Sequence, residues 1–482
     1  MSQTARSVRI LTMAHPIANL ERKALSLADP EPADRPDTDH RTHRIPDMKK
    51  PGRYEDASVE QILSPPEITI RESSSETLVV SLAAGTLTAT AVTRAYTCDK
   101  PLGPFHGLPI SIKACEGIAG LDNTAGFVGW VGRKNVEDAT IVKIFWKRVP
   151  SFMRERTEPQ GLMALDTCSS ITGNKVNPHN RDLSSGGLLG GGGGDSALQA
   201  LYDGPLGIGP DIGSTALSQP LVDPLDWMRC YVIGCETIMG TVGPLSPTPR
   251  GINLFMKAVL ASNPWMSDRT LHHIPWREHE PHIYQGEKKK LTVGKPYQQK
   301  EALEILLSTA ARRSLKTSLS RERHLPLLVW ILRDTPGIEE LDLHGVWDWT
   351  MKREVFRYTY LQEWNSIAQE MDVILCPAYP TPAPLVDTSR RWGYMSIWNL
   401  LGYSAIVFPV TKVDPERDAK DAAHKPQNEF DSWYHEYYNA QKQQDAPVCL
   451  QLVAKKLEDK KVVQALQEIK QMIGLPFVDC LA

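Results

Sequence analysis

The stretch SSGGLLGGGGGDSAL, residues Ser184 to Leu198, is the most unusual feature of this sequence, and GPLGIGPDIGST follows it at Gly204 to Thr215. Glycine adopts positive φ freely and lets other groups approach the backbone closely, so such runs often surround active sites. A phosphate-cradling loop would end in Gly-Lys-Ser or Gly-Lys-Thr, whereas Asp195 and Ser196 follow the glycines here. Nucleotide binding is therefore disfavoured, and an active-site loop or a flexible linker remains.

The neighbouring segments favour the active-site interpretation. Upstream, HGLPISIK is typical of a strand, over Leu108 to Lys113, that leads into a loop. A lysine at a strand end is ordinarily a surface charge, but a buried lysine loses its charge easily and can act as a base. Downstream, the second glycine-rich segment ends in two adjacent hydroxyls, Ser214 and Thr215.

These three segments resemble the amidase signature family, in particular its acetamidase-like branch. GPFHGLPISIK is similar to the family's lysine motif, QGLMALDTCSSITGNKVNPHNRDLSSGG to the segment before its glycine–serine motif, and GPLGIGPDIGST to its nucleophile segment. The similarity continues at TVGPLSPTPRGINLFMKAVLASNPW, VILCPAYPTPAP, WGYMSIWNLLGYSAIVFPVTKVDPE and APVCLQLVAKKLEDKKV. It spans most of the chain after residue 65 and implies an α/β fold, a large mixed twisted sheet flanked by helices.

The resemblance also implies a mechanism, hydrolysis of the C–N bond of a small or hydrophobic linear amide by a Ser–Ser–Lys triad. A neutral lysine takes a proton through a bridging serine, and a second serine attacks the carbonyl to form an acyl-enzyme. Backbone N–H groups of the nucleophile turn form the oxyanion hole. Water then releases the acid, so no metal or organic cofactor is implied.

Lys113 matches the family lysine, but the bridging serine is replaced. The family motif Gly-Gly-Ser-Ser-Gly-Gly aligns with Gly-Gly-Leu-Leu-Gly-Gly, residues 186–191, so Leu188 occupies the place of the bridging hydroxyl. Leucine cannot pass a proton. Ser184 and Ser185 lie just upstream and would substitute only if the loop were displaced by three or four residues.

The nucleophile turn also departs from the family pattern Asp-Ile-Gly-Gly-Ser, because this chain reads Asp-Ile-Gly-Ser-Thr over residues 211–215. In register, Thr215 is the nucleophile, and with a one-residue deletion Ser214 is. The resemblance assigns the oxyanion N–H groups to Ile212, Gly213 and Ser214, and places Leu162 beside the substrate.

These departures leave two functions open. The first is an amidase that retains activity, and the second is a catalytically inactive homologue that binds a ligand or partner through the same scaffold. Loss of a positioned proton carrier typically costs about 10²–10⁴ in rate, so the first function predicts slow turnover. The residue at position 188 separates the two, because restoring a serine there should help only an active enzyme.

Charge, hydrophobicity and cysteine content argue against several other classes of protein. The 482 residues carry 54 Lys+Arg and 57 Asp+Glu, and a net charge of −3 provides no electrostatic basis for nucleic-acid binding. The longest apolar run, Leu325 to Leu332, is too short to span a bilayer, which takes about 20 residues. Eight cysteines without Cys-x-x-Cys pairs fit a reducing, cytoplasmic protein. A mitochondrial presequence in residues 1–28 and assembly as a homodimer are kept as alternatives.

The chain divides into residues 1–65, an N-terminal helix and Pro/Asp/Arg-rich connector expected to be disordered, and residues 66–482, the amidase signature domain. Buried strands are predicted at Val373–Cys376, Ala405–Val410 and Val448–Val453. The polar segment 412–446 is predicted to be a solvated loop, and an amphipathic helix follows from about Leu457.

Composition also predicts the environment of three further segments. Phe145 to Glu158 carries six charged residues where the family has an apolar strand, which predicts a poor core segment. The His/Glu cluster of residues 272–282 has no trusted metal-ligand spacing and is interpreted as a solvated loop. The Trp/Tyr-rich stretches from Trp347 and from Trp392 are predicted to be core or pocket wall.

Overall fold

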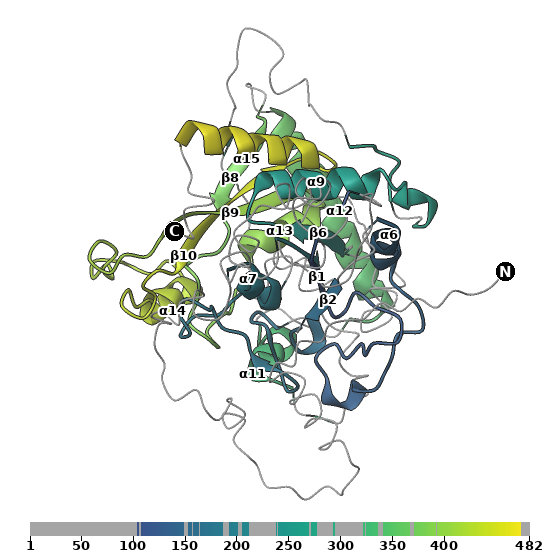
Figure 1. Ribbon diagram of the computed structural model, residues 1–482. Coiled ribbons are helices and arrows are strands. Elements are labelled where there is room, and N and C mark those ends of the chain that lie inside the picture. Colours follow the sequence, from purple (N-terminus) through teal and green to yellow (C-terminus); the bar gives the residue numbers. More distant parts are fainter. Residues whose placement is uncertain are drawn as a thin grey trace, which may run out of the picture.

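The computed structural model describes a mixed α/β protein (Figure 1). The described residues are 104–105, 108–148, 153–156, 158–162, 164–186, 192–200, 205–211, 238, 240–268, 271–276, 293–294, 322, 324–335, 341–366, 371–391 and 393–473. The N-terminal segment 1–65 lies outside these ranges, so the predicted domain boundary stays a prediction.

The first sheet has the strand order β2-β1-β5-β6 and is mixed. Its strands are β1 (Ile110–Lys113), β2 (Met153–Arg156), β5 (Leu206–Asp211) and β6 (Thr241–Leu245). β1 pairs in parallel with β2 and β5, and β6 is antiparallel to β5. The strand predicted before Lys113 is confirmed, and it is a central strand of this sheet.

The second sheet, also mixed, has the order β7-β8-β10-β9. Its strands are β7 (Val293–Gly294), β8 (Val373–Pro377), β9 (Ser404–Lys412) and β10 (Pro447–Ala454). β7 is parallel to β8, and β10 is antiparallel to both β8 and β9. All three strands predicted from apolar runs in the C-terminal third are confirmed.

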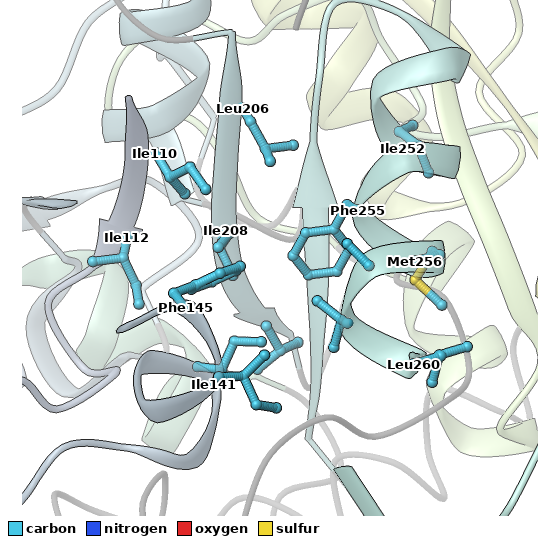
Figure 2. Close-up of a cluster of buried hydrophobic side chains, with 14 of the residues drawn as sticks. Ile110, Ile112, Ile141, Phe145, Leu206, Ile208, Ile252, Phe255, Met256 and Leu260 are labelled. Carbon is cyan, nitrogen blue, oxygen red and sulfur yellow. The ribbon is translucent and has the colours of Figure 1, made fainter. Parts of the chain in front are cut away.

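One hydrophobic core joins the two sheets, because residues of both belong to a single cluster of buried side chains. Figure 2 shows its centre, where the side chains of β1 and β5 meet those of helices α6 (Thr140–Arg148) and α9 (Pro249–Leu260). Helix α9 begins at a Thr248 N-cap, whose Oγ1 accepts a hydrogen bond from the Gly251 N–H at 3.1 Å. Ile110 and Ile112 of β1 are among the buried residues of this core.

The C-terminal helix α15 (Asp459–Ile473) covers the second sheet beside α9 (Figure 1). Val462 and Leu466 are buried in the core, and Ile469 packs against it. Spacings of three and four residues put these side chains on one helix face, as the sequence predicted.

The first Trp/Tyr-rich stretch forms helix α12 (Leu343–Ser366), and the second forms α13 (Gly393–Leu401). Tyr360 of α12 meets Trp398 of α13 edge to face, with ring centroids 6.3 Å apart, and both are fully buried. The prediction that these stretches are core is confirmed for α13 and for the side of α12 that carries Phe356, Tyr360 and Trp364.

The prediction for the polar segment 412–446 is wrong. The segment 412–446 is not a simple solvated loop, because it contains helix α14 (Glu429–Tyr437), whose Tyr434 is buried and bonded to Tyr379 at 2.8 Å between hydroxyl oxygens. Asn428 caps this helix by accepting from Asp431 N–H. Although the segment is polar on average, it contains a helix that packs on the protein through the buried Tyr434.

In the charged stretch 145–158, Phe145 and Glu158 are buried. The side chains of residues 146–157 lie outside the described part, so the predicted poor core stays a prediction. Its strand, β2, is the edge strand of the first sheet, where only one side needs a partner.

The remaining short elements are the following: η2 (Val128–Trp130), η3 (Gln160–Leu162), β3 (Cys168–Ser169), β4 (Gly173–Asn174), α7 (Gly192–Ala200), η4 (Pro264–Met266), α11 (Pro326–Val329) and η5 (Trp330–Asp334).

Candidate active site

Lys113 is the last residue of β1 and is buried, with 5% of its surface exposed. Side chains alternate along a strand, so Ile110 and Ile112 point into the core of Figure 2 while Ser111 and Lys113 face the other side of the sheet. All four residues are buried, so the lysine lies in a protein environment on that side. Lys113 is therefore a buried lysine at the end of a strand, and its role as a base stays a prediction.

The two parallel neighbours of β1 direct the chain to the same edge of the sheet. Ile112 is in register with Ile208 of β5, and β5 continues to Asp211. Parallel strands end at a common sheet edge, so Asp211, the residue before the nucleophile turn, lies at the edge where Lys113 lies.

Glu158 is a buried carboxylate that acts electrostatically on Lys113, and sequence analysis did not identify it. It follows β2, whose Arg156 is the register partner of Lys113. Its Oε1 accepts from Thr124 Oγ1 at 3.1 Å and from Gly126 N–H at 3.0 Å. Burial raises the pKa of Glu158 to about 7, and the charge of Lys113 and the hydrogen bonds oppose that rise.

Two loops cross closely to hold Glu158 in place. Gly161 N–H donates to Ala125 O at 2.7 Å. Gly126 has φ of +75°, and a Cβ on it would lie 2.7 Å from the Gln160 Cα. Leu162, predicted to line the substrate site, follows with φ of 59° and packs against the core beside β1. Its contact with a substrate stays a prediction.

Ser184 is committed to a buried polar network. Its Oγ donates to Asp166 Oδ1 at 2.9 Å and accepts from Gly186 N–H at 3.2 Å. Asp166 also accepts from Ser389 Oγ at 2.5 Å and from Asp387 N–H at 2.9 Å. Burial raises the pKa of Asp166, and these hydrogen bonds oppose the rise. The hydroxyl of Ser184 therefore holds the start of the glycine-rich loop.

Ser185 differs from Ser184, because its buried Oγ has no hydrogen-bond partner among the described residues. Its N–H donates to Lys175 O at 3.3 Å. Lys175 Nζ donates to Thr172 O at 2.8 Å, and burial lowers the pKa of this lysine to about 8. Of the two candidate relay serines, only Ser185 has a hydroxyl that is uncommitted within the described part of the chain.

The remaining candidates lie outside the described residues. They are Leu188, Ile212, Gly213, Ser214 and Thr215. The last three of the five consecutive glycines, Gly192 to Gly194, form the first turn of α7. The structure thus describes Lys113, Glu158 and both ends of the loops that carry the other groups.

Comparison with known proteins identifies the family. The family model described as Amidase matches residues 70–215 and 339–463. The chain belongs to the amidase family. The matched ranges include Lys113 and both glycine-rich segments, so the resemblance found in the sequence is confirmed, and with it the assignment to the hydrolases of C–N bonds.

Relatives of this amidase cover most of its length. A putative amidase from Schizosaccharomyces pombe is 33% identical over 77% of this chain and 78% of its own. An acetamidase from Aspergillus oryzae is 27% identical over 86% of this chain and 92% of its own. A solved structure of fatty acid amide hydrolase, 22% identical, has a TM-score of 0.74 and covers 96% of this chain and 95% of that one. The predicted amidase fold is confirmed.

The described part of this amidase also bears on metal binding and membrane insertion. Within the described ranges, no group of three or more His, Cys, Asp or Glu side chains is arranged to hold a metal ion. Of the His/Glu cluster, only His272 and His273 belong to those ranges. No helix found there is both long and apolar enough to cross a bilayer.

Proposed function

We propose that this amidase hydrolyses a small or hydrophobic linear amide through an acyl-enzyme, in the cytoplasm. The observation that carries the proposal is the burial of Lys113 at the end of β1. The parallel strand β5 ends on the same side of the sheet and leads toward the proposed nucleophile turn. A lysine held away from water can act as a base at neutral pH.

In this mechanism Lys113 accepts the proton of Thr215 or Ser214 as that hydroxyl oxygen bonds to the amide carbon. The N–H groups of Ile212, Gly213 and Ser214 would bind the oxyanion. The proton passes to the leaving amine as the C–N bond breaks, and water then hydrolyses the acyl-enzyme. Leu162 and Leu188 would contact the substrate.

The relay between Lys113 and the nucleophile is the weakest element of the site. Leu188 has no proton to exchange, and Ser184 is held by Asp166. Ser185 is the better candidate, since its Oγ is buried without a partner among the described residues. Without an effective relay the rate falls by about 10²–10⁴.

The relatives favour a small substrate. Two acetamidases, from Aspergillus oryzae and Emericella nidulans, match 86% of this chain and more than nine-tenths of their own. Acetamide is among the smallest amides, so short aliphatic amides are the first substrates to test.

Labelling with a fluorophosphonate, read by intact mass and peptide mapping, tests the proposal. We expect one adduct, on Ser214 or Thr215, that disappears in Lys113→Ala. Leu188→Ser should speed labelling by roughly 10-fold to 100-fold, because it restores a positioned proton carrier. A cooperatively folded protein that takes no label, with or without the restored serine, would instead be the inactive scaffold.

A further inference from the structure

Asp166 is a buried acid beside the start of the glycine-rich loop, with 2% of its surface exposed. Its Oδ1 accepts a hydrogen bond from Ser184 Oγ at 2.9 Å and another from Ser389 Oγ at 2.5 Å. Its Oδ2 accepts from Asp387 N–H at 2.9 Å. A carboxylate is rarely buried to this extent unless hydrogen bonds replace its water, and these three donors do so.

The carboxylate fixes the direction of the hydrogen bonds that it makes. An ionised carboxylate only accepts, so the hydroxyl of Ser184 must donate its proton to Asp166. The lone pairs of Ser184 Oγ are then left for an incoming donor. The Gly186 N–H is that donor, with its nitrogen 3.2 Å from the oxygen. Asp166 therefore acts on Gly186 through Ser184.

Other contacts hold the same turn, residues 184–186, from outside. Gly186 O accepts from Thr167 Oγ1 at 3.0 Å, and Ser184 N–H donates to Pro384 O at 2.9 Å. The backbone is thus held on both sides of Ser185. The Oγ of Ser185 is itself buried without a hydrogen-bond partner among the described residues. The turn combines a fixed backbone with one uncommitted hydroxyl.

We infer that Asp166 is a positioning residue, which fixes this turn through Ser184 and thereby the place of the Ser185 hydroxyl. The inference rests on the proposed function for the relay role of Ser185. A relay oxygen must lie within hydrogen-bond reach of both its partners, and a misplacement of about 1 Å can cost about 10²-fold in rate.

The proton balance of the relay leaves Asp166 unchanged. Ser185 Oγ–H gives its proton to the neutral Lys113 amine and takes the proton of the nucleophile hydroxyl as the new C–O bond forms. The proton returns by the same route to the leaving amine when the C–N bond breaks. Asp166 stays ionised throughout and acts only on the position of the turn.

Asp166→Asn is the variant that tests this role, because it keeps the shape of the side chain. To keep the Asp387 bond, the asparagine must turn its N–H₂ toward the two serine hydroxyls. This reverses the hydrogen bond to Ser184 and competes with the Gly186 N–H for its oxygen. Ser389→Ala is the matched control, since it removes the other hydroxyl from the same Oδ1 and leaves the bond to Gly186 in place.

The Gly186 amide reports on the linkage without any turnover. Ser185–Gly186 is the one Ser–Gly peptide bond in the 482 residues, so ¹³C-carbonyl serine with ¹⁵N-glycine selects a single amide resonance. Asp166→Asn should raise the hydrogen-exchange rate of this amide about 10-fold, as loss of one hydrogen bond does. Ser389→Ala should leave the rate unchanged. The spectra are recorded at mildly alkaline pH, which keeps the carboxylate ionised.

Fluorophosphonate inactivation tests the consequence for the reaction, because it separates binding of the reagent from bond formation. Asp166→Asn should lower the rate constant of bond formation about 10-fold and leave the binding constant unchanged. In a Ser185→Ala background the same substitution should have no further effect, since the hydroxyl that it positions is absent. A merely structural role predicts the same loss in both backgrounds, and that result would overturn the inference.

The two measurements fail in different ways. If the wild type takes no label but the Gly186 amide responds as expected, the proposed function fails and the positioning of the turn by Asp166 stands. If the amide exchanges equally fast in the wild type and in folded Asp166→Asn, the inference is wrong whatever the labelling shows. Should Asp166→Asn not fold, Ser184→Ala breaks the same link, keeps two of the bonds to Asp166, and replaces it in both measurements.

Discussion

At Gly126, a single residue determines how two loops meet at the buried Glu158. The residue has φ of +75°, which L side chains rarely adopt, and a Cβ would approach the Gln160 backbone to 2.7 Å. Its N–H is one of the two donors to Glu158 Oε1. Any side chain here would separate the loops and withdraw that donor.

Gly126→Ala should therefore destabilise the protein by about 2–4 kcal/mol, from the positive φ and the backbone overlap together. Gly132→Ala is the matched control, because Gly132 has φ of +88° but no atom within 4 Å of an added Cβ. Gly132→Ala should lower the free energy of unfolding by only about 1 kcal/mol, because the positive φ is the only source of strain. Equal losses in the free energy of unfolding, measured by denaturant titration, would contradict the role given to the loop crossing.

At the scale of elements, helix α12 shows how one helix can be apolar on two sides. Phe356, Tyr360 and Trp364 are buried, while Trp347 and Tyr358 are 58% and 66% exposed on the opposite side. Only the buried side contributes to the contact with α13 and the core. Apolar composition alone therefore does not show which residues of this helix stabilise the fold.

Two tyrosines of α12 provide a direct comparison. Tyr360→Ala should destabilise the protein by about 3–5 kcal/mol, because it empties a fully buried site packed against Trp398 and Tyr403. Tyr358→Ala should change the free energy of unfolding by no more than about 0.5 kcal/mol. Chemical denaturation of both variants measures the difference, and similar values would show that the exposed side has a partner in solution.

At the scale of the whole molecule, three acids with raised pKa values make stability depend on pH. Burial raises the pKa of Glu158, Asp166 and Glu322, so the folded protein binds protons that the unfolded chain has released. Their stabilising contribution is complete below the ordinary carboxyl pKa and is lost as pH rises through the folded values. For Glu158 that window runs from 4.5 to about 7.

Glu158→Gln should remove this loss. Relative to the variant, the wild type should lose roughly 3 kcal/mol of unfolding free energy between about pH 4.5 and pH 8. Glu354→Gln is the control, since the pKa of Glu354 is lowered and its titration lies below that window. If wild type and Glu158→Gln differ in unfolding free energy by the same amount at both pH values, the raised pKa is contradicted.

Whole-molecule contacts also explain which parts of the site the sequence could predict. Lys113 was predictable, because a short apolar strand and a family motif are both local patterns. The role of Ser184 was not predictable, because its hydroxyl is hydrogen-bonded to Asp166. Asp166 in turn binds Ser389, which lies 223 positions from Asp166 in the chain. Helix α14 was missed for the same reason, since its anchor Tyr434 bonds to the distant Tyr379.

The sequence by itself determined the family, the strands at the lysine and in the C-terminal third, and the amphipathic helix α15. These follow from motif order and from periodicities of 2 and 3.6, which are properties of neighbouring residues. The burial of Glu158 and the hydrogen bond between Ser184 and Asp166 depend instead on the tertiary structure. Burial of a charge depends on which distant groups surround it, and no local pattern encodes that environment.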